Sequence, residues 1–154
     1  MRVLGIDYGA RRIGLALSDP SGTLASPWRT IERPVSDAST LVAMIGEIQT
    51  LMSEDEGLGA VVIGWPRRLD GRPTHQTPLI EAFARGLGER IALPVVLQDE
   101  RLSSHEADER LATSEPDWRK RKAKLDAAAA AVILQDYLDR RARDEGAPAD
   151  DDRR

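Results

Sequence analysis

Acidic side chains stand at or near the ends of two apolar runs of the sequence. Asp7 follows the run Val3–Ile6 and precedes a glycine turn, and the run Pro94–Leu97 leads into the pair Asp99-Glu100. An ionised carboxylate at the end of a buried strand is costly unless a cation or a hydrogen-bond donor compensates it. Asp7 and Glu100 are therefore the first candidates for residues that do chemistry.

A predicted helix supplies a third carboxylate, Asp126. It shares a helical face with Ala129, Ala130, Ile133 and Tyr137, which places it on the packed stripe of the helix rather than on the solvent side. The small side chains of 127–131 would let this helix approach its neighbour closely and bring Asp126 near Asp7. A run of alanines is also simply a strong helix former, so this interpretation stays open.

Each acid has an ordinary alternative explanation as well. Asp7 would also suit capping of the turn at Tyr8-Gly9, and Glu100 would suit pairing with Arg101 or plain exposure. Asp126 would suit the N-cap or the first turn of its helix, where the helix dipole favours an acid. If all three gather at one site, their mutual repulsion requires a counter-charge, and Mg²⁺ or Mn²⁺ is the cation that such oxygen ligands prefer.

The elements that must position these acids follow from hydrophobic periodicity. Strands are predicted at Val3–Ile6, Ile13–Leu17, Ala60–Trp65 and Pro94–Leu97, with a weaker one at Thr23–Ile31. Helices are predicted over Leu41–Met52 (capped by Ser36 or Asp37 and ended by Gly57), from Thr77 as N-cap and Pro78 in the first turn to Leu87, after Ser103, and over Lys124–Arg143.

This order, βββαβαβαα, favours an α/β fold in which helices flank both faces of a five-stranded mixed sheet. If the first and last strands run parallel on either side of Ala60–Trp65, they lie about 10 Å apart and end at the same sheet edge. A long glutamate side chain at position 100 could then reach towards Asp7.

Composition bounds the class of protein. The chain has 154 residues, is 41% hydrophobic and 31% charged, and has no cysteine. The length predicts a single domain over 1–143. The lack of cysteine excludes disulfides and thiolate metal sites, and a reducing cytoplasm is the expected compartment. No apolar run is long enough for a transmembrane helix, so no membrane partner is expected.

The net charge of −4 is concentrated in the acidic segment 144–154, which is predicted to be a disordered tail. The remainder holds 20 basic and 21 acidic residues, with the basic residues in local clusters. A near-neutral body with basic patches is compatible with a phosphate-bearing partner.

Four groups of residues together resemble the YqgF (RuvX-type) family of the ribonuclease H-like superfamily. They are Gly5-Ile6-Asp7-Tyr8-Gly9 with Arg12–Ala16, Val62–Pro66 with Asp70-Gly71, Asp99–Ser104, and Lys124–Ala129, in the family's order. The resemblance implies a ribonuclease H-like nuclease whose metal-binding catalytic acids are Asp7, Glu100 and Asp126.

Members of this family resemble nucleases proposed to process the 5′ end of pre-16S rRNA, which implies structured RNA and pre-ribosomal particles as partners. They also resemble Holliday junction resolvases, for which the substrate would be branched DNA. One departure is Arg67-Arg68, where the family tends to have uncharged residues, so the substrate contacts of that loop are not carried over.

Our hypothesis for the mechanism is hydrolysis by two metal ions. Asp7 would bridge two Mg²⁺ or Mn²⁺ ions, and Glu100 and Asp126 would each complete one coordination shell. One ion would activate water and the other would stabilise the leaving oxygen, so no His or Lys base is required. His75 and His105 have no partner at metal-ligand spacing and are expected to be polar surface residues.

Basic residues near these acids are predicted to bind nucleic acid. Trp118 precedes a basic run and resembles a stacking side chain beside phosphate-binding charges, the alternative being a solvated loop in which Trp118 covers a core edge. The predicted set is Arg11, Arg12, Arg67, Arg68, Arg72, Trp118, Arg119, Lys120, Arg121, Lys122 and Lys124.

Two other functions stay open. The segment Gly5–Gly9 also resembles the first phosphate loop of actin-like ATPases and sugar kinases, although those proteins enclose ATP between two such domains. Alternatively, the same fold with little catalysis would act as a nucleic-acid-binding assembly factor. The sequence alone does not separate such a factor from a slow or very selective nuclease.

Overall fold

The computed structural model describes residues 1–33, 36–65, 72–99 and 118–146, and only the backbone is considered for 118–124. The elements are β1 (Arg2–Tyr8), β2 (Arg12–Ser18), β3 (Ala25–Glu32), α1 (Asp37–Ser53), β4 (Leu58–Trp65), α2 (Thr77–Arg90), β5 (Val95–Asp99) and α4 (Trp118–Gly146). The strands form one sheet in the order β3-β2-β1-β4-β5. The β1–β2 and β2–β3 pairs are antiparallel, whereas β1–β4 and β4–β5 are parallel, which confirms the predicted mixed sheet.

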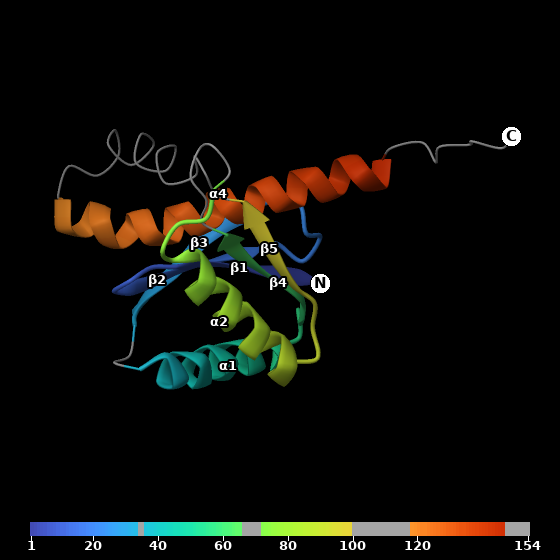
Figure 1. Cartoon of the computed structure of the whole chain (residues 1–154). Coiled ribbons are helices and arrows are strands. Elements are labelled where there is room, and N and C mark those ends of the chain that lie inside the picture. The colour runs from blue at the N-terminus through green and yellow to red at the C-terminus, as the bar shows by residue number, and fades with distance from the viewer. Residues whose placement is uncertain (34–35, 66–71, 100–117, 147–154) are drawn as a thin grey trace, which may run out of the picture.

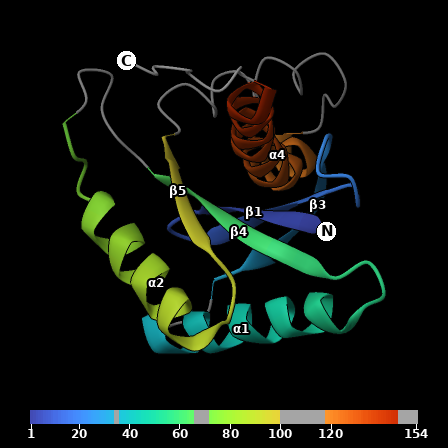
Figure 2. The ribbon, with the colours of Figure 1, turned by 90° about the vertical axis from the view of Figure 1, so that its right-hand side faces the viewer.

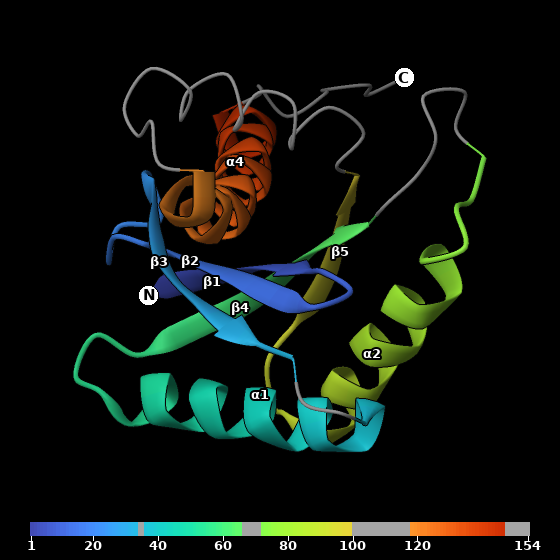
Figure 3. The ribbon, with the colours of Figure 1, turned by 90° about the vertical axis from the view of Figure 1, so that its left-hand side faces the viewer.

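The sheet separates two helical layers, with α1 and α2 on one face and the long α4 across the other (Figure 1). Turning the molecule by 90° to either side shows the same three layers (Figures 2 and 3). Strand alternation assigns β1 side chains to these layers. Leu4, Ile6 and Tyr8 belong to the core beneath α1 and α2, while Val3 belongs to the core beneath α4. Asp7 therefore lies on the α4 side of the sheet.

Helix α1 forms where its sequence predicts it. The Oγ atom of Ser36 accepts a hydrogen bond from the Ser39 backbone nitrogen, which is the standard N-cap arrangement. The helix ends at Ser53, four residues before Gly57, and Gly57 instead takes a positive φ of 63° in the turn that leads into β4. In α2, Gln76 occupies the N-cap position, so Thr77 is the first helical residue rather than the cap.

Helix α4 begins at Trp118, six residues earlier than predicted, and continues to Gly146. The predicted loop alternative for 118–122 is therefore wrong, because this basic segment is helical. Asp126 lies in the third turn, which also excludes the N-cap or first-turn explanation for that acid. The helix predicted after Ser103 lies outside the described residues. None of the described helices is long and apolar enough to cross a lipid bilayer.

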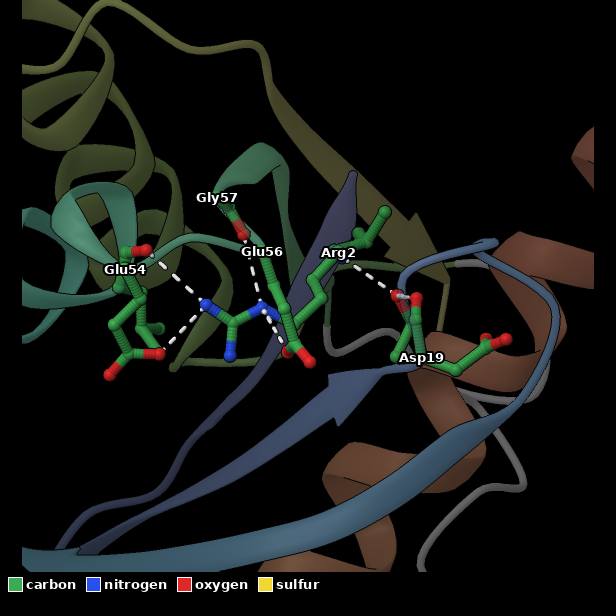
Figure 4. A network of polar contacts seen from close by, with 8 residues as sticks. Arg2, Asp19, Glu54, Glu56 and Gly57 are labelled. Atoms are coloured by element: carbon green, nitrogen blue, oxygen red, sulfur yellow. Dashed lines mark hydrogen bonds and ion pairs between the residues drawn. The ribbon is translucent and has the colours of Figure 1, made fainter.

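At the opposite end of the sheet, Arg2 ties β1 to the end of α1 (Figure 4). Its guanidinium donates hydrogen bonds to the carbonyl oxygens of Leu51 and Gly57, at 3.3 and 3.1 Å, and to Glu54 Oε2 at 2.9 Å. Glu56 Oε2 lies 3.4 Å from Arg2 Nε. The Arg2 side chain is only 8% exposed, so these acceptors replace the water that a buried cation loses.

Candidate active site

Asp7 stands near the carboxyl end of β1, directly opposite Gly14 of β2 in the antiparallel register. The neighbouring positions on the same face, Val3 and Gly5, lie beneath α4. The Asp7 residue is half-buried, as the apolar run before it predicts. Strands β1 and β5 run parallel with β4 between them, so the end of β5 at Asp99 lies at the same edge, as the sequence predicts.

Two glycines of the sheet allow α4 to approach it closely. A Cβ atom added at Gly14 would lie 1.9 Å from the backbone oxygen of Asp126, a distance that no atoms can share without movement. A Cβ at Gly5 would lie 2.8 Å from the Cβ of Leu134, two turns further along the helix. The backbone of Asp126 is thereby pressed against the strand position that pairs with Asp7.

The two acids brought together in this way influence one another electrostatically. Burial, and next the charge of Asp126, raise the pKa of Asp7 from 3.8 to about 7. Asp126 in turn forms an ion pair with Arg12, whose Nε lies 3.0 Å from Asp126 Oδ2. Both side chains of this pair are about a quarter exposed, at 27% and 28%. One arginine therefore offsets part of the negative charge, and Asp7 still keeps a strongly raised pKa.

The carboxylates of Asp7 and Asp126 would suit a hard divalent cation, but they are two ligands where three are predicted. Carboxylate oxygens are the ligands that Mg²⁺ and Mn²⁺ favour, and Asp7 and Asp126 come from opposite ends of the chain to one place. Among the described residues no group of three His, Cys, Asp or Glu side chains is close enough to hold a metal ion. The third predicted ligand, Glu100, lies outside the described residues. The described part of the chain thus supplies two of the three predicted acids.

Of the predicted nucleic-acid-binding residues, Arg11 and Arg12 stand at the turn and start of β2, beside Asp7. Together with Glu32 and Arg33 they line an open hollow of about 310 Å³. Arg72 is exposed and stands five residues before α2, whereas Arg67 and Arg68 lie outside the described residues. The backbone of α4 carries the remaining predicted residues, Trp118, Arg119, Lys120, Arg121, Lys122 and Lys124.

Sequence reasoning missed two contributions to this region. It attributed the close helix approach to the alanines of α4, which are indeed buried against the sheet, but it overlooked the sheet glycines Gly5 and Gly14 that face them. Glycine inside an apolar strand was the available signal. It also overlooked Arg33, whose backbone nitrogen donates to the Arg11 carbonyl oxygen at 2.8 Å and whose guanidinium lies 4.5 Å from the centre of the Tyr8 ring. No local pattern marks Arg33 in the sequence.

Comparison with known proteins identifies the family. The family model described as "RuvX: Holliday junction resolvase" matches residues 1–140. The chain belongs to the RuvX family. Curated members named "Putative pre-16S rRNA nuclease" include that of Maridesulfovibrio salexigens, 43% identical over 140 residues that cover 91% of this chain and 99% of the relative. The one from Geobacillus kaustophilus is 39% identical, covering 90% of this chain and 98% of the relative.

Solved structures show that the RuvX chain has the ribonuclease H-like fold predicted from its sequence. Thermus thermophilus RuvC, solved with a Holliday junction substrate, aligns with a TM-score of 0.52 and 15% identity over 92% of this chain and 96% of RuvC. The fowlpox virus Holliday junction resolvase aligns with a TM-score of 0.54 and 11% identity over 91% of this chain and 99% of the resolvase. Together with the relatives, the family identifies the chain as a nuclease.

Proposed function

We propose that this RuvX-family chain is a metal-dependent nuclease that hydrolyses phosphodiester bonds at the 5′ end of the pre-16S rRNA. The observation that carries the proposal is the pairing of Asp7 with Asp126 at the carboxyl edge of the sheet, where Asp7 has a pKa of about 7. A site with this excess of negative charge gains from a divalent cation. It also lies beside the arginines that a phosphate group would need.

In this proposal Asp7, Glu100 and Asp126 hold Mg²⁺ or Mn²⁺. The chemistry that two bound ions supply is activation of a water nucleophile and stabilisation of the leaving oxygen. Asp7 would be the ligand common to both ions, because burial and the nearby charge of Asp126 already raise its pKa and a cation would offset both effects. Arg12 orients Asp126 through the 3.0 Å ion pair and leaves the Asp7 carboxylate to the metal.

The basic residues hold the substrate strand. Arg11 and Arg12 are adjacent to Asp7 and would bind the phosphate next to the reacting one, while Arg67, Arg68 and Arg72 would bind a more distant part of the RNA. On α4, Arg119–Lys122 and Lys124 would bind phosphates and Trp118 would stack on a base. Replacing Arg119, Lys120, Arg121 and Lys122 by Ala should weaken RNA binding and flatten its salt dependence; an unchanged salt slope removes this segment from the proposal.

The choice of substrate rests on the relatives, whose curated names specify pre-16S rRNA. Such a nuclease would act in the cytoplasm on pre-ribosomal particles. The second candidate is resolution of branched DNA, which the description of the matching family model favours. The same carboxylates would serve either substrate, because both reactions hydrolyse a phosphodiester bond.

The test compares cleavage of a pre-16S rRNA fragment, duplex RNA, single-stranded RNA and a four-way DNA junction, each with Mg²⁺, Mn²⁺ or chelator. Wild-type protein is compared with Asp7→Asn, Glu100→Gln and the exposed control Asp55→Asn. We expect cleavage of the rRNA fragment to need metal, to fall at least 100-fold in Asp7→Asn, to fall less in Glu100→Gln, and to be unchanged in Asp55→Asn.

Cleavage that survives Asp7→Asn would overturn the assignment of the site. Equal and mild losses in Asp7→Asn and Glu100→Gln would contradict the bridging role of Asp7. Cleavage of the DNA junction alone would select the resolvase function over rRNA processing.

A further inference from the structure

Beside the acidic site, three hollows follow one another along the surface of the described chain. The 310 Å³ hollow at Arg11 and Arg12 has Arg33 as its far wall. Arg33 is also a wall of a second cavity of about 130 Å³, and Tyr8 and Leu79 are shared between this cavity and a third of about 190 Å³. Neighbouring hollows therefore share wall residues, from the arginines near Asp7 to an aromatic and aliphatic pocket that Phe83 and Leu41 also line.

Two walls of the middle cavity are planar groups that pack on one another, the Tyr8 ring and the Arg33 guanidinium. The Tyr8 ring packs against Phe83 with 4.4 Å between ring centres, and the Arg33 guanidinium covers Tyr8 at 4.5 Å. Arg33 is held in turn by an ion pair with Asp37 and by its backbone hydrogen bond to Arg11. A guanidinium fixed in this way presents a planar cation, which is a good stacking surface for a nucleobase.

The rest of the lining combines apolar and polar groups. Leu79 is 47% exposed although it is apolar, so the cavity has an open hydrophobic side. His75 and Gln76 stand at the rim, and the Gln76 side chain does not cap α2. An apolar pocket with a few polar groups at its edge is typical of sites for planar heterocycles, whose faces are apolar and whose edges form hydrogen bonds.

Size and position fit one base of the substrate strand. A cavity of about 150 Å³ holds a benzene molecule. The middle cavity, of about 130 Å³, is therefore large enough for one six-membered ring of a nucleobase, and the rest of the nucleotide would lie outside it. Tyr8 follows Asp7 directly, and alternation along β1 puts the two on opposite faces of the sheet. A strand that crosses the edge at the β1–β2 turn would have a phosphate at Asp7 and a neighbouring base in the cavity.

We infer that the cavity formed by Tyr8, Arg33 and Leu79 binds one unpaired nucleobase next to the phosphodiester that the acidic site cleaves. The inference rests on the proposed nuclease function and adds a substrate feature to it. A base inside a duplex is stacked on both faces and cannot enter. The cavity therefore selects a single-stranded or extruded nucleotide beside the cleaved bond.

The experiment measures binding of a fluorescently labelled single-stranded RNA octamer, in chelator, by anisotropy. A parallel series of octamers carries one abasic residue at each position in turn. We compare wild-type protein with Leu79→Trp, which fills the cavity from its exposed side. The matched control is Val42→Trp on α1, where the wild-type side chain is 70% exposed and lines none of the three hollows.

For wild-type protein, we expect at least one abasic position to weaken binding about tenfold, the usual effect of losing one stacked base. Leu79→Trp should bind the intact octamer about tenfold more weakly and should no longer distinguish it from that abasic octamer. Val42→Trp should behave as wild type. A second variant, Arg33→Lys, keeps the charge but loses the plane, so discrimination should fall while the salt dependence of binding is retained.

The inference is overturned if Leu79→Trp and Arg33→Lys discriminate as wild type does, or if wild-type protein binds every abasic octamer as tightly as the intact one. Wild-type cleavage that is equally fast on every abasic octamer and on the intact one would overturn the inference but leave the proposed nuclease function standing. If wild-type protein neither binds nor cleaves any of the nucleic acids, the proposed function itself fails and the inference fails with it.

Discussion

Replacing Gly14 by Ala tests whether the tight contact between α4 and the sheet builds the acidic site. The added methyl group would lie 1.9 Å from the Asp126 oxygen and 2.2 Å from the Asp126 carbonyl carbon. Ordinary contacts between such atoms begin at about 3.4 Å, so the helix backbone must retreat by about 1.5 Å at this point. The obstacle is backbone rather than a flexible side chain, and it cannot rotate away.

The retreat has an energetic and a functional consequence. Overpacking of this kind costs about 3 kcal/mol of unfolding free energy, which in a chain of this size lowers Tm by about 10 °C. Moving Asp126 away from Asp7 also removes part of the charge that raises the Asp7 pKa, so that pKa should fall from about 7 towards 3.8. A displacement above 1 Å of a catalytic group typically costs about 100-fold in rate, and we expect a loss of that size.

The assay combines thermal unfolding, nuclease rate below Tm, and carboxyl-carbon NMR titration of Asp7. The control is Gly46→Ala on the exposed side of α1, where an added Cβ has no neighbour within 4 Å and should stabilise by up to about 1 kcal/mol. Gly5→Ala provides a second comparison, because it presses on Leu134 rather than on Asp126. Wild-type rate and wild-type Asp7 pKa in Gly14→Ala would refute the reasoning.

Two further predictions concern stability. In chelator, Asp7 binds its proton more tightly in the folded protein than in the unfolded chain, because its pKa is raised on folding. The free energy of unfolding should therefore decrease by up to about 4 kcal/mol as pH rises from about 4 to 7. Above pH 7 this contribution should stay level. Asp7→Asn should abolish this slope, leaving the variant more stable than wild type at pH 8 but equal at pH 3.5 in urea titrations; parallel curves would contradict the raised pKa. Arg2→Met should remove about 3 kcal/mol, because a buried cation with three hydrogen bonds is lost, and an unchanged Tm would show that the network in Figure 4 is not stabilising.

The strands and α1 could be predicted from the sequence because their patterns are local. Apolar runs located β1, β2, β4 and β5, and a weaker run located β3 near its observed position. Ser36 marked the start of α1 through its capping hydroxyl. Helix α4 was predicted six residues too short because its first turns contain mostly charged residues. Such a segment has no apolar stripe, and its charges suit a helix and a loop equally well.

The site could be predicted only in outline. That Asp7 and Asp126 are near one another follows from their places on a sheet edge and on a packed helical stripe. The sequence does not predict the contact between Asp126 and Gly14 that brings the two acids together, because this contact depends on how α4 crosses the sheet. The Arg12–Asp126 ion pair and the stacking of Arg33 on Tyr8 also join distant segments. The sequence placed Arg12 near Asp7 but did not indicate that it pairs with Asp126, and no local pattern marks Arg33.

The crossing of α4 over β1 has a consequence for synthesis of the protein. Asp126 is synthesised 119 residues after Asp7. An emerging chain can pair β1 with β2 and β3 long before α4 exists, yet the acid pair is absent until the final helix has left the exit tunnel and docked. In the proposed nuclease, a product stalled before α4 would have the hairpins without the acid pair, and so would not cleave nearby RNA.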